Sequence, residues 1–254
     1  MRVSGFTVDD TSTPSVVARQ AALYEQQWSE RSGGAYSPDL LRYRVFGPRL
    51  RGRVLDIGAG DGLLARTFPD RDVWSVDLAA AGLRRVAGRA VVALADALPF
   101  PRQTFDTVVL SEVLEHVPDP MGALLECRRV CVAGGTFLMS VPLWPLSRVE
   151  WWYHRRRIGA VPTMENLRDW DPNHERRYSR AEIVRLVEAA GWDVERVVPL
   201  FGEASSTAVY WAEPQIAKRT GRDVAIAQHL HPLDRLVGRR SSGIAVIAQK
   251  RASG

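Results

Sequence analysis

Short apolar runs alternate with stretches of helical period through the middle of the chain. Five such runs predict strands, over residues 54–57, 72–76, 90–94, 105–110 and 135–141. The stretches between them predict helices over residues 63–68, 79–87 and 120–130. The runs are nearly all apolar rather than alternating with polar residues, as expected for strands that helices cover on both faces. This order predicts an α/β fold with a doubly wound parallel sheet.

A weaker helix-strand unit follows. Ser179 and Glu182 form a capping-box pattern that opens a predicted helix over residues 179–190, and Gly191 ends it. Strands are predicted over residues 192–198 and 243–250, which makes seven in all. Helices are also predicted on the N-terminal side, from Pro14 to Trp28 and over residues 38–46. The chain is therefore expected to consist of an N-terminal helical segment, 1–48, and a larger domain, 49–254.

Two long connections interrupt that domain. Residues 142–178 show no clean helical period and are rich in tryptophan and arginine. Residues 201–242 carry helical signals around 208–218 and 233–237. Long irregular segments inside a compact domain are usually lids or binding loops. We therefore expect these two insertions to form a binding site.

The charge and cysteine content narrow the classes of function only slightly. The 254 residues carry a formal net charge of +5, which permits anionic partners, although solvated arginine-rich faces explain it more simply. The two cysteines, Cys127 and Cys131, are too few for a disulfide framework or a zinc site. No metal site is expected. The chain shows neither a signal-peptide core nor an apolar run that could span a bilayer, so we expect a cytoplasmic protein.

The turn after the first strand is the clearest candidate for ligand binding. Asp56 ends the apolar run, and Gly58, Gly60 and Gly62 follow at alternate positions before a helix begins. Glycines let the backbone turn sharply and approach a ligand closely. The spacing matches neither the dinucleotide pattern nor the phosphate-binding P-loop. An acid before the glycines instead suggests a ligand with a cationic group, such as an α-amino group.

Acids also follow the next two strands. Asp77 ends the second strand and Asp96 follows the third. Ligands of such sheets bind at the carboxyl ends of the strands, so the acids should meet in one crevice, where Asp77 could accept both ribose hydroxyls. A single aspartate at a strand end can instead be a helix cap. Three together favour a nucleoside with an aminoacyl group.

With their neighbours, these residues resemble class I S-adenosylmethionine-dependent methyltransferases of the small-molecule type. The motifs that carry the resemblance are Val54–Gly62, Asp77, Asp96–Phe100, Phe105–Val109, Ser111–Val117 and Arg129–Gly135. They cover residues 53–141 strongly, and the unit at 179–198 more weakly. The resemblance implies a seven-stranded Rossmann-like sheet with an antiparallel last strand, helices on both faces and an N-terminal helical lid. It also implies S-adenosylmethionine as the cofactor.

The resemblance assigns a cofactor role to residues that follow the first four strands. Those implied at the methionyl part are Asp56, Gly58, Ala59, Gly60, Gly62, Ser111 and Glu112. Those implied at the nucleoside are Asp77 on the ribose, Leu78 packed on the adenine, and Asp96 and Ala97 hydrogen-bonded to the adenine.

The acceptor side is less defined. An oxygen or nitrogen acceptor can require a general base, and His116 is the first candidate because it follows the fourth strand; a structural histidine is the alternative. The residues that we expect to contact the acceptor are Trp144, Trp151, Trp152 and His154. Flat aromatic side chains suit an apolar or aromatic small molecule, although they could also pack the insertions onto the sheet. O-methylation of a natural-product or lipid-linked metabolite is the predicted function.

Two other interpretations remain open. The basic pI slightly favours an RNA or protein methyltransferase, but no RNA-binding module is visible, so a nucleic-acid partner is not expected. A non-catalytic partner subunit could keep the fold, although it would not need Asp56 or Asp77. The basic run from His154 to Arg157 could meet a phosphate group or a membrane surface, but a solvated face is the simpler explanation. A monomer or a homodimer is expected.

Overall fold

The seven strands form one sheet. The computed structural model describes residues 16–30, 37–159, 161–163, 176–220, 225–237 and 240–251. Within these residues the strands are β1 Arg53–Ile57, β2 Asp72–Asp77, β3 Arg89–Val92, β4 Phe105–Ser111, β5 Cys131–Pro142, β6 Trp192–Leu200 and β7 Gly243–Lys250. Their order in the sheet is β3-β2-β1-β4-β5-β7-β6. Neighbours among β1 to β5 pair in parallel, whereas β7 is antiparallel to β5 and β6. The predicted sheet, with its antiparallel last strand, is confirmed.

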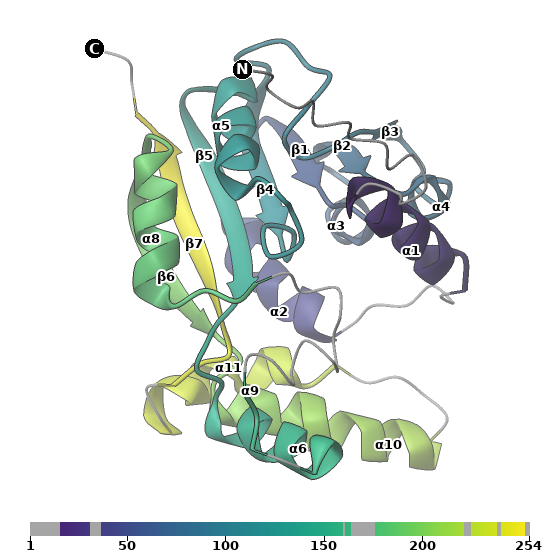
Figure 1. The fold of residues 1–254 in the computed structure, drawn as a ribbon, viewed down its shortest axis with the longest axis vertical. Helices are drawn as coiled ribbons and strands as arrows, with labels where there is room; N and C mark the ends of the chain where they lie inside the picture. The colour runs from purple at the N-terminus through teal and green to yellow at the C-terminus, as the bar shows by residue number, and fades with distance from the viewer. Residues whose placement is uncertain are drawn as a thin grey trace, which may run out of the picture.

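Helices cover both faces of this sheet. Consecutive residues of a strand point to opposite faces. Leu55 and Phe137 face a core beneath α5 Pro120–Val130 and α8 Arg180–Ala189, which lie side by side along the sheet in Figure 1. Their neighbours Val54 and Leu138 face a second core with α2 Ser37–Phe46 and α3 Leu63–Thr67. The doubly wound arrangement follows from the near-continuous apolar runs.

The two insertions fold together into a helical cap. It consists of α6 Arg148–Ile158, α9 Glu203–Thr207, the π-helical turn η2 Ala208–Ala212, α10 Glu213–Thr220 and α11 Ala227–Val237. In Figure 1 these helices lie together below the end of β5. Buried acids join them: Asp234 accepts backbone hydrogen bonds at the start of α9, and Glu213 does the same at the start of α11.

Helix α6 was not expected from the sequence. Its two tryptophans are adjacent and three arginines follow in a row, so no apolar stripe of helical period appears. The ends of the helix do carry signals. The Ser147 hydroxyl accepts a hydrogen bond from the Glu150 N–H at the start, and Gly159 adopts a left-handed conformation at the end. The remainder of that insertion, residues 164–175, lies outside the described residues.

Several element boundaries also differ from the prediction. The helix predicted over residues 79–87 is the single turn α4, Ala80–Leu83, and β3 ends at Val92. Strand β5 begins four residues early, at Cys131, because a register irregularity between Phe105 and Thr107 lets it pair with the start of β4. In the described part of the chain, no helix is both long and apolar enough to cross a membrane.

Trp192 should be a major source of stability. Its side chain is fully buried and stacked on Phe137, with 4.5 Å between the ring centroids. We expect Trp192→Ala to lower the free energy of unfolding by about 3–5 kcal/mol, because truncation leaves a large cavity. Urea unfolding followed by circular dichroism measures the change. Trp152→Ala, at a side chain that is 56% exposed, is the control and should change it by about 0.5 kcal/mol or less; equal effects of the two variants would contradict this.

Candidate active site

A cavity of about 600 Å3 lies between the carboxyl ends of the strands and the N-terminal helix α1, Val16–Glu30. Of the residues predicted to bind the cofactor or the acceptor, it is lined by Gly58, Asp77, Leu78, Asp96, Glu112 and His116. Helix α1 contributes Gln20, Tyr24 and Trp28 to the opposite wall. The predicted nucleoside, methionyl and catalytic positions therefore share one cavity.

Hydrogen bonds hold the glycine turn, residues 58–62, against the end of β2. Gly58, Gly60 and Gly62 all have positive φ values, of 75°, 54° and 76°, a region that favours glycine. The N–H groups of Gly58 and Ala59 both donate to the carbonyl of Val76, at 2.8 and 2.9 Å. A Cβ on Gly60 would lie 2.2 Å from the Trp28 ring of α1. The turn therefore needs glycine both for its conformation and for the contact with α1.

Asp77 holds this turn from the end of β2. One carboxylate oxygen accepts from the Gly60 N–H and the other from the Ala79 N–H, each at 2.8 Å. Burial raises the pKa of Asp77, and these backbone hydrogen bonds partly oppose the rise. A carboxylate offers about four lone-pair sites. Two donors therefore leave capacity for ligand hydroxyl groups at this cavity-lining carboxylate.

Asp56 lies behind the turn and is only 4% exposed. Burial, followed by the charge of Asp77, raises the pKa of Asp56 to about 8. The carboxyl group is thus largely protonated at neutral pH in the protein alone. A cation placed beside it would lower its pKa again.

Two of the three residues predicted at the adenine line the cavity, and the third does not. Asp96 and Leu78 line the cavity together with Ala93, Leu94 and Ala95. Ala97 is exposed and does not line the cavity. Its N–H donates to the carbonyl of Leu94 at 3.2 Å.

Glu112, just after β4, has a positive φ of 54°. Such a conformation is uncommon for a residue with a side chain and occurs preferentially at functional sites. The Ser140 hydroxyl donates to one oxygen of its carboxylate at 2.8 Å, and Arg42 of α2 lies 2.9 Å from the other. Ser111 is hydrogen-bonded to Ser140 at 3.0 Å. The sequence pointed to Glu112 and Ser111 but not to the residues that hold them.

His116 is fixed from two sides. Gln20 donates to its backbone carbonyl at 2.8 Å, and the Tyr24 ring meets its imidazole edge-on, with 5.8 Å between centroids. Its Nε2 lies 3.8 Å from the carboxylate of Glu115, which is fully buried. Burial and the charge of Glu112 raise the pKa of Glu115. The imidazole thus faces the cavity beside a carboxyl group that favours the protonated state.

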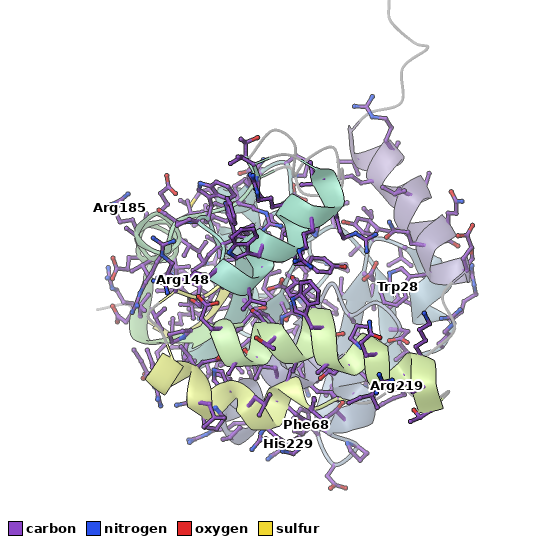
Figure 2. All side chains as sticks on the ribbon, turned by 90° about the horizontal axis from the view of Figure 1, so that it is seen from below. Trp28, Phe68, Arg148, Arg185, Arg219 and His229 are labelled. Atoms are coloured by element: carbon purple, nitrogen blue, oxygen red, sulfur yellow. The ribbon has the colours of Figure 1, made fainter. Side chains whose placement is uncertain are left out.

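Helix α1 is held over the cavity by an acid as well as by packing. Glu25 accepts from the Ala81 N–H at 2.8 Å and from Arg84 at 2.6 Å. Trp28, labelled in Figure 2, points from α1 toward the body of the molecule. The N-terminal helix therefore covers the cofactor side of the sheet.

The four residues expected at the acceptor do not line this cavity. Trp144 lies just before α6 and is half-buried, as is Trp151 on α6 itself, whereas Trp152 is exposed. His154 is fully buried in the cap, where its Nε2 lies 3.4 Å from Glu150. These side chains belong to the helical cap rather than to the wall beneath α1.

The charge of the site suits the expected ligand. Asp77, Asp96 and Glu112 line the cavity, and Asp56 lies directly behind it. Carboxylates can accept from ribose and amino donors and favour a positive ligand, whereas they would repel a pyrophosphate. A sulfonium ion with an aminoacyl chain and a nucleoside fits this set of hydrogen-bond acceptors. Among the described residues, no group of three or more side chains could hold a metal ion.

Sequence comparison places the chain in a family. The model of the "Methyltransferase domain" family matches residues 28–197, a range that includes the glycine turn and the ends of β2 and β4. The chain belongs to this family. The protein is an enzyme of the class I S-adenosylmethionine-dependent methyltransferases, and S-adenosylmethionine is its cofactor.

The relatives of this methyltransferase include enzymes of quinone biosynthesis. A demethylmenaquinone methyltransferase of Roseiflexus castenholzii is 34% identical, and the match covers 62% of this chain and 76% of that protein. A ubiquinone biosynthesis O-methyltransferase of Idiomarina loihiensis is 33% identical over 54% of this chain and 60% of that protein. A ubiquinone/menaquinone biosynthesis C-methyltransferase of Cupriavidus taiwanensis is 32% identical over 72% and 87%, respectively.

Solved structures with the same fold are more distant in sequence. The geranyl diphosphate C-methyltransferase of Streptomyces coelicolor A3(2) has a TM-score of 0.60 at 14% identity, with 93% of this chain and 100% of that chain covered. The [4+2]-cyclase SpnF also scores 0.60, at 17% identity, and covers 94% and 98%. These likenesses show the fold alone, and a cyclase among them shows that the fold does not determine the reaction.

Asp56 gives the methyltransferase a pH dependence of stability that can be tested. The pKa of an unfolded aspartate is about 3.9, so protonation of the buried carboxyl favours the folded state. That stability is fully present below about pH 4 and is lost as the pH rises through about 8. Asp56→Asn mimics the protonated form. Relative to the natural protein, the variant should gain on the order of a few kcal/mol between about pH 5 and pH 9.

Urea unfolding at both pH values, without cofactor, measures this difference. Asp72→Asn, at the exposed start of β2, is the control and should show the pH profile of the natural protein. Parallel profiles for Asp56→Asn and the natural protein would mean that the buried carboxyl is not protonated near neutral pH.

Proposed function

We propose that this enzyme transfers the methyl group of S-adenosylmethionine to the hydroxyl group of a small, largely apolar or aromatic metabolite. The observation that carries the proposal is the shared cavity, which joins Asp77 and Glu112 to His116. Val113, Val117 and Pro118 give its wall an apolar character beside His116. A binding site that is mostly apolar, with a few convergent polar groups, is typical for a small molecule.

The proposed cofactor contacts follow the geometry of the cavity. Asp77 accepts from the ribose hydroxyls while it keeps the turn in place, Leu78 packs on the adenine, and Asp96 accepts from the adenine amino group. Asp56 would ionise when the amino group of the cofactor lies near it. The backbone that carries the methionyl part is that of Gly58, Ala59, Gly60, Gly62, Ser111 and Glu112.

The bound cofactor supplies an electrophilic methyl group on a sulfonium. The chain contributes alignment and exclusion of water, with α1 as the lid over the site. His116 accepts the proton of the acceptor hydroxyl while the oxygen bonds to the methyl carbon. The cofactor would supply a neutral thioether as the leaving group, and the glycine turn with Ser111 and Glu112 would hold it. Gln20 and Tyr24 hold His116 in the position from which it acts.

The relatives support a phenolic or quinone-like acceptor. Two of them are named for ubiquinone or menaquinone biosynthesis and differ in methylating oxygen or carbon. His116 beside the cavity would serve transfer to oxygen, because the proton of the hydroxyl group must be removed. We further propose that the insertions 142–178 and 201–242 bind the remainder of the acceptor, with the half-buried Trp144 and Trp151 among the contacts. A cavity covered by α1 favours such a molecule over RNA or protein, and a cytoplasmic location suits it.

Cofactor binding should depend on Asp77. We expect Asp77→Asn to weaken the affinity for S-adenosylmethionine by about 10- to 100-fold, because hydrogen bonds to a charged acceptor contribute about 1.5–3 kcal/mol. The amide can still accept from one of the two backbone donors, so the turn is retained. Calorimetric titration measures the affinity, with Asp72→Asn on the same strand as the control. Unchanged affinity in Asp77→Asn would rule out the ribose contact.

Turnover should depend on His116. We expect His116→Ala to lower kcat by about 10²–10⁴-fold, the range typical of a lost general base. Affinity for the cofactor should change little, because the side chain acts on the acceptor. Transfer of labelled methyl from S-adenosylmethionine to a panel of phenols measures turnover. His231→Ala, on α11, is the matched control; full turnover in His116→Ala would exclude the histidine as the base.

A further inference from the structure

The outer surface of the helical cap carries positive charge with its acids turned inward. On α6 and α10 the acids Glu150 and Glu213 are buried, at 4% and 8% exposure. Basic side chains of the same helices are exposed, namely Arg156 and Arg157 near the end of α6 and Lys218 and Arg219 at the end of α10. The surface is therefore more basic than the composition of the helices indicates.

Tryptophans lie among these bases. Trp152 is 56% exposed and Trp211 is 39% exposed, and both are among the few large apolar side chains exposed in the described chain. The guanidinium of Arg156, one turn after Trp152, lies 5.6 Å from the centre of the Trp211 ring. The Tyr153 and Tyr210 rings meet at a tilt, with 4.6 Å between their centroids, and this contact brings α6 against η2. These contacts join α6 to η2, and the helices of the cap lie at the front of the view in Figure 2.

We propose that this basic-aromatic face, formed by Trp152, Arg156, Arg157 and Trp211, docks on an anionic lipid bilayer. Anionic headgroups attract exposed lysines and arginines, with about 1 kcal/mol for each base near the surface. Tryptophan prefers the boundary between headgroups and acyl chains, where its ring is buried and its N–H stays hydrated. The side chains of this face supply both interactions at once.

The aromatic component favours a bilayer over a nucleic acid. The phosphate backbone of a nucleic acid binds lysine and arginine side chains. Large exposed indole rings add affinity for a nucleic acid only where unpaired nucleotides stack on them. Here Arg155, Arg156 and Arg157 each lie over an aromatic ring of the cap itself. Docking would bring the cap, and the insertions in it, to a membrane in which apolar acceptors dissolve.

Membrane docking is a property separate from the proposed methyl transfer, and it can be measured without an enzyme assay. The full chain is sedimented with phosphatidylcholine vesicles that contain or lack phosphatidylglycerol. Binding is expected only with the anionic lipid and should weaken as salt is added. Arg156→Glu combined with Arg157→Glu should lower the partition coefficient by more than about tenfold. Trp152→Ser combined with Trp211→Ser should also lower it while leaving the salt dependence unchanged.

The control removes equal charge from another face. Arg180→Glu with Arg185→Glu changes two exposed arginines of α8, and Arg185 lies away from the cap in Figure 2. This variant should bind vesicles like the natural protein. Cooperative thermal unfolding shows that each variant is folded, and Arg156→Gln with Arg157→Gln serves if the glutamates disturb the end of α6.

Three results would overturn the proposal. The first is equal sedimentation with and without phosphatidylglycerol. The second is an equal loss of binding in the α8 variant, which would mean that only net charge matters. The third is binding of total RNA in a gel shift by a protein that does not sediment with either vesicle. None of these outcomes depends on whether the proposed methyl transfer occurs.

Discussion

The site depends on one carboxylate that two backbone segments share. Asp77 accepts from the Gly60 N–H of the glycine turn and from the Ala79 N–H beyond β2. These hydrogen bonds set the turn after β1 against the end of β2, and Trp28 then packs on Gly60. A buried carboxylate with such donors loses less from desolvation than an isolated one. The same group lines the cavity, so the structural and the proposed binding roles coincide.

The second constraint is electrostatic. Asp56, Asp77 and Glu115 all have pKa values raised mainly by burial, so the protein disfavours the ionised form of each carboxyl group. Arg42 and Ser140 hold the carboxylate of Glu112 nearby. A cationic cofactor beside the buried acids would lower their pKa values again and favour the ionised forms.

The cap formed by the two insertions has an inner side that joins its helices and an outer side that faces solvent. Toward the interior, the carboxylates of Glu213 and Asp234 accept hydrogen bonds from backbone N–H groups at the starts of α11 and α9. These hydrogen bonds join the helices of the cap. Toward solvent, the arginines and tryptophans of the cap remain available for an outside partner. The cap is thus built like a small amphipathic layer at the carboxyl ends of the strands, and the proposed membrane contact follows from that division.

The sequence by itself determined the strands, the glycine turn and the acids at the strand ends. These follow from local periodicity and from backbone rules that act within a few residues, whereas the antiparallel last strand was implied by the resemblance to a family. Helix α6 was not predicted because its tryptophans and arginines form no apolar stripe. The contact of Arg42 with Glu112 was not predicted either, because the spacing of Arg42 from Asp39 resembles that of an ordinary exposed ion pair on a helix. Only the tertiary structure decided which acids are buried, because burial depends on contacts between elements that lie far apart in the chain.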